Sequence, residues 1–428
     1  MPPRPGRPIG AVLLGVLALL LSACSPAAES AEQTTTLSVF GPWLGRSADA
    51  FRASLEPFEE RSGVEVVYTG TGNLAGDATR RLQDGQPPDV VIFPQPGLMN
   101  ELAERGYLLP LRADVAQAAI DSHSEGVVEA AEGVTSLTGV LYRLNVKSLV
   151  WYSPDAFAEA GYAVATTWSE LQSLVDAMAF DGTSPWCFGV EAFGASGWPA
   201  TDWIEDIMLR SQELGVYDAW VDGELPFTDD AVSDAFLDFQ AMTLLPGLSL
   251  QGRRGVLNTA WDTAQEPMFL DPPACLLHRQ ASFQTDNLDP SIDIGPDGDT
   301  DVFPLPSQDG SDPPLLVGGT FAAAGTDREE TWDLLAYLAS PEGSAAWVER
   351  GGFISPHEDV EAEDYANPFD ARMDELLAST DVVRFDGSDM MYPQVGTRTF
   401  LDAMLLFIAT GRLEDSLERA QAGYDEGS

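Results

Sequence analysis

Short apolar strands alternate with amphipathic helices over the first third of the chain, and this order restricts the fold more than any other feature. Residues 36–40 alternate in polarity as a strand does, and residues 48–61 repeat apolar side chains at helical spacing. The pattern then predicts a strand at 64–68, a helix at 77–83, a strand at 89–93 and a helix at 98–105. Because residues 89–93 are almost continuously apolar, they are typical of a strand buried on both faces of a parallel sheet. This alternation predicts a doubly wound α/β fold.

The α/β pattern continues after residue 139 without a long linker. Residues 139–152 are long for one strand, and a pair of strands crossing from one lobe to another would have this appearance. Thr167, with Glu170 three residues later, forms a capping box that predicts a helix start. Further helices are expected at 203–214, 231–242, 329–340 and 401–418, a Pro-, Gly- and Asp-rich loop at 290–314, and a strand at 315–324. A chain of this length favours two large lobes over a single core.

The first two dozen residues carry the pattern of an export signal. Arg4 and Arg7 precede an apolar run at 9–21 that is too short for a comfortable membrane span. The sequence Leu21-Ser22-Ala23-Cys24 resembles the lipobox of bacterial lipoproteins. This resemblance implies a signal peptide at 1–23, lipidation (palmitate and related acyl chains) of Cys24, and a flexible tether at 24–35. We therefore expect a lipid-anchored protein on the extracytoplasmic face of a cell membrane, at the cell surface or in a periplasm. The alternative is an ordinary secretory signal with a chance cysteine.

The chain is strongly acidic, with a formal net charge of −46, yet 44% of its residues are hydrophobic, which indicates a globular protein. Nucleic acid is not an expected partner, since binding phosphates needs Lys and Arg. A solvated acidic surface is favoured over specific cation binding. Asp297, Asp299 and Asp301 match the first ligand positions of a calcium loop, but Val302 and Gln308 stand where glycine and glutamate are required. No metal and no cofactor are expected.

Two cysteines besides Cys24 remain, Cys187 and Cys275. An even pair in an exported protein predicts a disulfide between them. Two buried free thiols are the alternative.

A series of short motifs, spread in order over the mature chain, resembles a known family. The motifs are Val39-Phe40-Gly41-Pro42-Trp43, Pro87-Pro88-Asp89-Val90-Val91, Tyr142-Arg143-x-Asn145-x-Lys147-Ser148-Leu149-Val150-Trp151-Tyr152, Gly197-Trp198-Pro199-x-Thr201-Asp202-Trp203-Ile204-Glu205-Asp206, His278-Arg279-Gln280-Ala281-Ser282-Phe283, Gly351-Gly352-Phe353-Ile354-Ser355-Pro356 and Phe385-Asp386-Gly387-Ser388-Asp389. They resemble the sugar-binding lipoproteins of ABC importers, and among these the α-glucoside-binding members, distant relatives of the maltose-binding protein.

The resemblance implies a two-lobed periplasmic-binding-protein fold (type II, Venus-flytrap) with a hinge between α/β lobes. The N-terminal lobe is expected to comprise 36–145 and about 284–339, and the C-terminal lobe about 146–283 and 340–428. It also implies a monomer that captures a carbohydrate by hinge closure and hands it to the transmembrane permease subunits of an ABC transporter. A separate ATPase would power transport, because the chain has no G-x-x-x-x-G-K-[ST] loop.

A sugar site needs aromatic rings for the C–H faces of the ligand and charged or amide groups for its hydroxyls. Trp198, Asp202 and Trp203 supply two rings and an acid within six positions. The alternative for Trp203 is a place in the core. The strand ends at residues 40 and 93 add Trp43, Phe93 and Gln95, because the carboxyl ends of parallel strands face the ligand crevice.

Basic and glycine residues complete the candidate sugar-binding set. Arg143 and Lys147 lie on one face of the expected crossing strand, and Arg279 stands beside Gln280. The resemblance adds Gly319, in the strand Val317-Gly318-Gly319-Thr320, which has only two glycines. Asp386 and Asp389 lie in a Gly-Ser turn, where a role in turn formation is favoured.

Two other classes of function remain as alternatives. The first is a binding lipoprotein for a non-sugar solute such as a peptide, a polyamine or a metal chelate. The second is a glycoside-active enzyme with a carboxylate pair. We expect no enzyme, because the chain has neither an H-E-x-x-H motif nor a G-x-S-x-G elbow, and its many acids are explained by surface charge.

Overall fold

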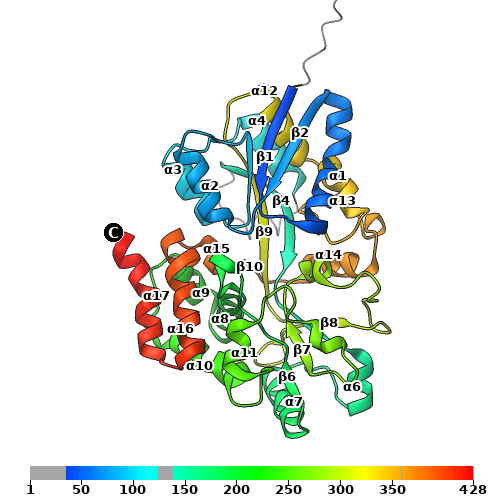
Figure 1. Cartoon of the computed structure of the whole chain (residues 1–428), viewed down its shortest axis with the longest axis vertical. Helices are drawn as coiled ribbons and strands as arrows, with labels where there is room; N and C mark the ends of the chain where they lie inside the picture. The colour runs from blue at the N-terminus through cyan, green and yellow to red at the C-terminus, as the bar shows by residue number, and fades with distance from the viewer. Residues whose placement is uncertain (1–34, 124–137, 358, 428) are drawn as a thin grey trace, which may run out of the picture. The chain divides into compact units, whose positions relative to one another are not determined.

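The computed structural model describes residues 35–123, 138–357 and 359–427 (Figure 1). The expected signal peptide, Cys24 and nearly all of the expected tether lie outside these residues. Within the described ranges, no helix has the length and apolar character that a membrane span requires.

The described residues contain strands that belong to two sheets. The strands are β1 (Thr35–Gly41), β2 (Val64–Gly70), β3 (Val90–Phe93), β4 (Gly139–Val146), β5 (Leu149–Tyr152), β6 (Ser184–Trp186), β7 (Cys275–Arg279), β8 (Asp301–Pro304), β9 (Leu315–Ala324) and β10 (Val383–Phe385).

Helices connect and cover these strands. They are α1 (Gly45–Ser62), α2 (Leu74–Gln83), α3 (Pro96–Glu104), α4 (Ala113–Ser122), α6 (Pro154–Ala160), α7 (Trp168–Phe180), α8 (Trp198–Ser211), α9 (Leu214–Val221), α10 (Asp230–Phe239), α11 (Gly252–Asn258), α12 (Glu329–Leu338), α13 (Pro341–Val348), α14 (Pro368–Ser379), α15 (Gly387–Met390), α16 (Phe400–Thr410) and α17 (Leu413–Gly427). Short 3-10 turns are η1 (Phe193–Ala195), η3 (Glu266–Phe269), η4 (Ser282–Asn287) and η5 (Ala362–Asp364), and π turns are η2 (Gln240–Leu244) and η6 (Val395–Thr399).

The first sheet has the strand order β10-β9-β3-β1-β2, with β4 on the other side of β9. β1 pairs in parallel with both β2 and β3, as the α/β pattern predicts, whereas β9 is antiparallel to β3 and β4. Figure 1 shows β9 and β4 side by side. The second sheet has the order β6-β7-β5-β8.

The segment 139–152 passes from one sheet to the other, as predicted. β4 pairs with β9 in the first sheet, and β5 pairs with β7 and β8 in the second. Only residues 147 and 148 separate the two strands. Lys147 and Ser148 therefore stand at the point where the chain changes sheets.

Local signals in the sequence explain several helix ends. Gly63 ends α1 in the left-handed conformation, with φ 71°, and the Thr167 side chain accepts a hydrogen bond from the Glu170 amide at the start of α7. The Glu170 carboxylate accepts from the amide of Thr166, one residue before the position that a reciprocal capping box uses.

Three predicted elements differ from the structure. α8 begins at Trp198, five residues before the expected start, and Pro199 suits its first turn. The helix expected at 401–418 is two helices, because Gly411, with φ 70°, ends α16. The loop expected at 290–314 contains the short strand β8.

The lobe boundaries remain a prediction. Strand pairing and helix packing nevertheless show where two elements inside the expected segments lie. β8 was expected in the N-terminal lobe, and it pairs with β5 in the second sheet. α13, expected in the C-terminal lobe, packs against α1, which follows the first strand of the first sheet. The chain therefore passes between the two sheets more often than the motifs alone indicated.

Candidate functional site

Three partly exposed aromatic rings meet at the N-terminal end of α8. The ring of Trp198 lies 5.2 Å from that of Trp261 and 6.0 Å from that of Phe283, centroid to centroid. The rings of Trp261 and Phe283 are 5.9 Å apart, and all three side chains are half-buried. We call these three residues the open cluster. A group of partly exposed aromatic rings of this kind is a candidate interaction or ligand site.

The backbone around the open cluster is fixed by local contacts. Gly197, with φ 109°, lies so close to Leu401 that a Cβ at residue 197 would be 2.9 Å from the Leu401 carbonyl oxygen. This glycine therefore allows α8 to begin with Trp198. The Trp261 amide donates to the Glu191 carbonyl at 3.1 Å. These contacts hold the two indoles in place from separate segments.

Lys147 connects the open cluster to a buried network of charges. Its ammonium lies 5.7 Å from the centre of the Trp198 ring. It forms an ion pair with Asp386 and lies 3.4 Å from Asp202 and 3.6 Å from Asp389. The side chains of Asp202 and Asp386 are each 1% exposed, whereas that of Asp389 is 17% exposed. Asp389 is thus the member of this group that faces solvent.

The second half of the network centres on Asp206. This carboxylate pairs with both Arg210 and Arg279, and it accepts a hydrogen bond from Ser148 at 2.6 Å. Arg279 also lies 3.5 Å from Asp202, which joins the two halves. An isolated buried charge is costly, and this mutual pairing removes most of that cost.

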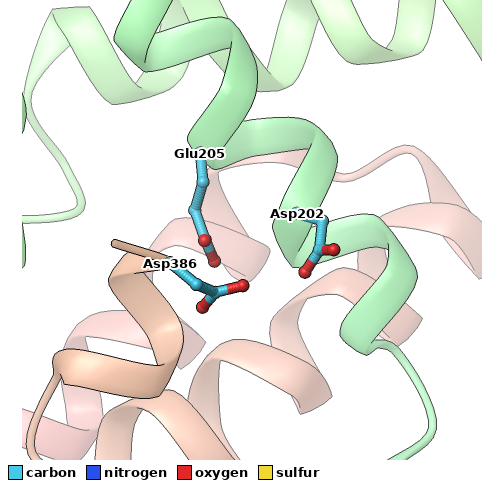
Figure 2. A group of neighbouring side chains, drawn as sticks. All are labelled: Asp202, Glu205 and Asp386. Atoms are coloured by element: carbon cyan, nitrogen blue, oxygen red, sulfur yellow. The ribbon is translucent and has the colours of Figure 1, made fainter. Parts of the chain in front are cut away.

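Figure 2 shows the carboxylates of Asp202, Glu205 and Asp386 pointing toward one another from α8 and the start of α15. Oxygen atoms of the three lie within 4.8 Å of each other. Burial raises the pKa of Asp202 to about 7 and that of Glu205 well above its usual value, and the charge of Asp386 adds to both shifts. Burial opposes ionisation of Asp386 as well, but Lys147 outweighs it and lowers the pKa of Asp386 to about 2. Asp386 is therefore the member of the three that ionises most readily.

The same three acids are the one group of this kind, among the described residues, that could hold a metal ion. The Lys147 ammonium already pairs with two of them, so a charge-balanced network explains their proximity. In the acidic loop considered for calcium, the Asp299 carboxylate accepts from the Asp293 amide, and Asp301 pairs with Arg372. The Asp299 carboxylate therefore stabilises the loop, and that of Asp301 binds the loop to α14.

Arg143 lies on β4, the strand that ends immediately before Lys147. Its guanidinium stacks over the Trp347 ring at 4.9 Å, donates to the Gly352 carbonyl, and lies 3.4 Å from the Asp286 carboxylate. Asp286 belongs to η4, the turn that carries Phe283, and it also accepts from the Ser47 hydroxyl at 2.8 Å. Arg143 thus contacts the turn that forms one side of the open cluster.

Comparison of the sequence with known proteins identifies its family. Residues 44–345 match the family described as bacterial extracellular solute-binding protein. The osmoprotective compounds-binding protein GgtB of Synechocystis sp. is 36% identical over 92% of this chain and 93% of its own length. The alpha-glucosides-binding periplasmic protein AglE of Rhizobium meliloti is 35% identical over 91% of this chain and 87% of its own length.

This chain is a bacterial extracellular solute-binding protein. Its fold is that of two-lobed solute-binding proteins, as predicted. A solute receptor whose structure is described with a preference for β-D-galactopyranose aligns with a TM-score of 0.78 at 18% identity, over 92% of this chain and 98% of the other. A maltose-bound protein of T. maritima aligns with a TM-score of 0.70 at 16% identity, over 91% and 98%.

Several residues predicted to bind sugar lie inside the solute-binding protein rather than at its surface. Trp43 is 7% exposed and packs among the rings of Phe51, Tyr68, Tyr142 and Trp347. We call these five residues the closed cluster. Tyr68 fixes the Trp43 backbone on both sides, accepting from its amide at 2.8 Å and donating to its carbonyl. Trp43 therefore presents no open face for stacking.

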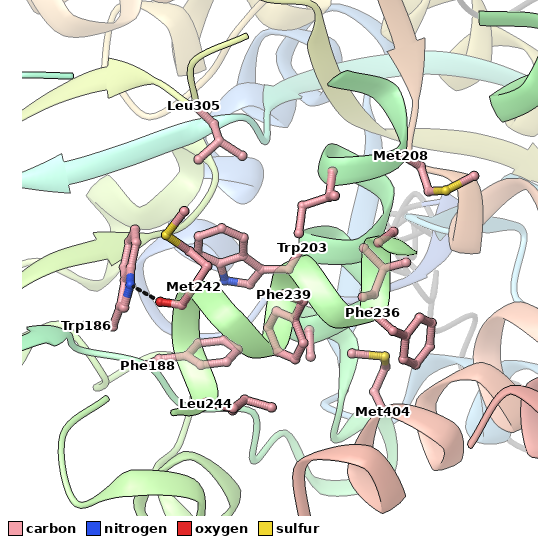
Figure 3. Close-up of a cluster of buried hydrophobic side chains, with 14 of the residues drawn as sticks. Trp186, Phe188, Trp203, Met208, Phe236, Phe239, Met242, Leu244, Leu305 and Met404 are labelled. Atoms are coloured by element: carbon pink, nitrogen blue, oxygen red, sulfur yellow. Dashed lines mark hydrogen bonds between the residues drawn. The ribbon is translucent and has the colours of Figure 1, made fainter. Parts of the chain in front are cut away.

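Phe93 and Trp203 are also core residues. Phe93 is fully buried opposite Phe321 of β9. Trp203 is 1% exposed, and its ring meets that of Trp186 edge-on at 5.0 Å in the cluster drawn in Figure 3. For Trp203 this is the core alternative that the sequence left open. Gly319 also faces the core, since a Cβ there would lie 2.7 Å from the Leu141 side chain.

Most of the remaining candidates belong to the open cluster or its charge network. Lys147, Asp202 and Arg279 are buried in the network, and Trp198 stands at its outer edge. Gln95 is half-buried at the start of α3 and does not cap that helix with its side chain. Their roles in binding remain predictions.

Sequence reasoning missed Trp261 and Phe283 in the binding protein. Trp261 lies in a segment without periodicity, and nothing local sets it apart. Phe283 is the last residue of the motif His278–Phe283 that carried the family resemblance, so that motif could have pointed to it as a ligand residue.

A disulfide joins Cys187, just after β6, to Cys275 at the start of β7, with their Cα atoms 5.4 Å apart. The Cys187 carbonyl contacts Nδ1 of the buried His278 at 2.8 Å. The bond ties the ends of two neighbouring strands of the second sheet.

Proposed function

We propose that this protein captures a small neutral sugar, an α-glucoside or another short oligosaccharide, and delivers it to the permease of an ABC importer. The observation that carries the proposal is the open cluster of three half-buried rings beside buried hydrogen-bonding groups. Aromatic faces stack on the C–H faces of sugar rings, and charged planar groups bind hydroxyls strongly. The AglE relative is named for alpha-glucosides, which supports this ligand class.

The second relative, GgtB, is named for osmoprotective compounds, so we also consider an osmoprotectant that carries a quaternary ammonium group as the competing ligand. Aromatic rings do bind quaternary ammonium groups. In this protein, however, the Lys147 ammonium already lies 5.7 Å from the Trp198 ring centre. Because the protein supplies its own ammonium at this ring, the open cluster favours a neutral polyol over a ligand that would place a second ammonium there.

The protein acts by binding and not by catalysis, with the ligand held as its lobes close. We expect it to stay at the membrane through Cys24. In a Cys24→Ala variant, the precursor should remain unlipidated and change its membrane fractionation. A variant that matures and fractionates with membranes as the wild type does would contradict this anchor.

The ligand class is tested with a fixed panel. Maltose, trehalose and sucrose represent α-linked disaccharides, cellobiose a β-linked one, and glycine betaine a zwitterionic osmoprotectant with a quaternary ammonium group. We expect at least one α-linked sugar to raise Tm and to bind by calorimetry, with the sugar recovered unchanged by chromatography. Binding of glycine betaine alone would replace the sugar proposal, and cleavage of a disaccharide would make the protein an enzyme.

A further inference from the structure

Three buried polar atoms on the central strands have no hydrogen-bond partner among the described residues. They are Nε of Arg143, Oδ1 of Asn145 and Oγ1 of Thr320. The residues are 3%, 8% and 5% exposed, so solvent does not reach them freely. Nearly all buried polar groups in proteins are paired, and an unpaired one is costly. Three such atoms close together therefore require an explanation.

The three residues lie on one face of the first sheet. Arg143 and Asn145 are two positions apart on β4, and Thr320 of β9 stands directly opposite Arg143. Gly318 stands opposite Asn145 and has no side chain to fill the space there, which the Lys147 side chain enters. The other face of these strands belongs to the core, with Leu144, Val146 and Phe321.

This row of polar groups leads toward the open cluster. Lys147, the next residue with the same orientation on the chain, lies over the Trp198 ring. At the other end, Arg143 approaches Asp286 at 3.4 Å, in the turn that carries Phe283. Both ends of the row thus contact elements of the open cluster.

We propose that Arg143, Asn145 and Thr320 form a polar floor that hydrogen-bonds hydroxyl groups of the ligand. The inference rests on the proposed function and extends it to residues outside the aromatic platform. The unpaired atoms comprise an N–H donor, a carbonyl acceptor and a hydroxyl that does both. An alcohol both donates and accepts, so it can satisfy all three. A cation would meet the guanidinium, and an anion would meet the Asn145 carbonyl oxygen, which only accepts.

Removal of one floor group tests the proposal. Thr320→Val keeps the shape of the side chain and deletes the hydroxyl. We expect its affinity for the α-linked disaccharide that binds wild type best, among maltose, trehalose and sucrose, to fall about 10-fold. We also expect Tm of the sugar-free protein to stay unchanged or rise, because the variant no longer buries an unpaired group. Asn145→Ala should likewise lose affinity for the same sugar.

Thr399→Val is the matched control. Thr399 is fully buried, and its hydroxyl donates to the Ala420 carbonyl at 2.9 Å. This variant should lower Tm and leave sugar affinity unchanged. Thr320→Val is expected to show the opposite pattern, with lower sugar affinity and no loss of Tm. This difference separates a ligand-binding hydroxyl from a structural one.

The outcomes that overturn the proposal are distinct. If wild type binds a sugar but Thr320→Val and Asn145→Ala bind it equally well, the floor is wrong and the proposed function stands. If both variants lower Tm with affinity unchanged, the atoms hold structural water only. If wild type binds none of the sugars, the proposed function fails and the floor with it.

Discussion

The open and closed clusters are both rich in aromatic residues, yet they have different surroundings. The closed cluster packs its rings against one another, with Trp43 only 4.8 Å from Phe51 and 5.0 Å from Trp347. The rings of the open cluster stay half-buried and lie beside an ammonium and a solvent-facing carboxylate. Aromatic content alone therefore does not identify a ligand platform. The exposure of the rings distinguishes the two, since both clusters have a cationic side chain beside a ring.

The largest effect is expected from the closed cluster. Trp43→Ala removes a buried indole and should lower the free energy of unfolding by about 3–5 kcal/mol, because a cavity replaces its ring contacts. Denaturant melts measure this loss, and calorimetry on the folded fraction should find sugar affinity nearly unchanged. A variant that melts as wild type but loses affinity would show that Trp43 contacts the ligand.

The open cluster should respond in the opposite way. Trp198→Ala should weaken sugar binding by about 2 kcal/mol or more, roughly 30-fold, since truncated aromatic anchors commonly cost this much. Its unfolding free energy should fall less than that of Trp43→Ala. Trp203→Ala serves as the core control, because Trp203 is close in sequence but only 1% exposed. This variant should lose free energy of unfolding and not sugar affinity. Wild-type affinity in Trp198→Ala would remove the open cluster from the site.

Acid gives a way to weaken folding without changing either ring cluster. Burial lowers the pKa of His278 to about 4. Between the unfolded value of about 6.5 and this folded value, the unfolded state binds more protons, so stability falls as pH falls. From pH 7.5 to 5.5, the His278 contribution should cost about 1 kcal/mol. Urea melts of wild type and His278→Gln at both pH values should show a smaller loss in the variant, and equal losses would contradict this assignment.

The smallest effect is expected at Phe193, an aromatic residue outside both clusters. It is 84% exposed and has φ 51°, a left-handed conformation that a bulky residue adopts at a cost. Phe193→Gly relieves this strain but adds backbone freedom, so the unfolding free energy should change by less than about 1 kcal/mol. Sugar affinity should not change. A clear loss of affinity would mean that Phe193 also contacts the ligand and belongs with the three residues of the open cluster.

The parts of the fold that depend on local pattern could be predicted from the sequence. Alternation placed the strand at 36–40 within β1, and the long segment 139–152 correctly indicated two strands crossing between sheets. The boundary of α8 was missed because Trp198 followed a glycine and preceded a proline, which suggested a loop. A first-turn proline fits a helix start equally well.

The candidate site was less predictable because its members come from distant segments. Trp198, Trp261 and Phe283 meet only after the chain has passed through several helices, and no local periodicity encodes that meeting. Trp43 and Phe93 follow strand ends as ligand residues do, but tight neighbours such as Tyr68 and Phe321 cover them. A sequence supplies the residue types of a site more readily than their exposure.

The position of β9 has a consequence for the order of synthesis. This strand pairs with β3, β4 and β10, yet it comes more than 160 residues after β4 begins. As the chain grows from its N-terminus, β3 and β4 lack their shared partner until residue 324 has been made. The early α/β segment, which looks in sequence like a complete unit, would keep open strand edges until then, and open edges pair readily with other chains. A fragment that stops before β9 would therefore lack the strand that completes its own sheet.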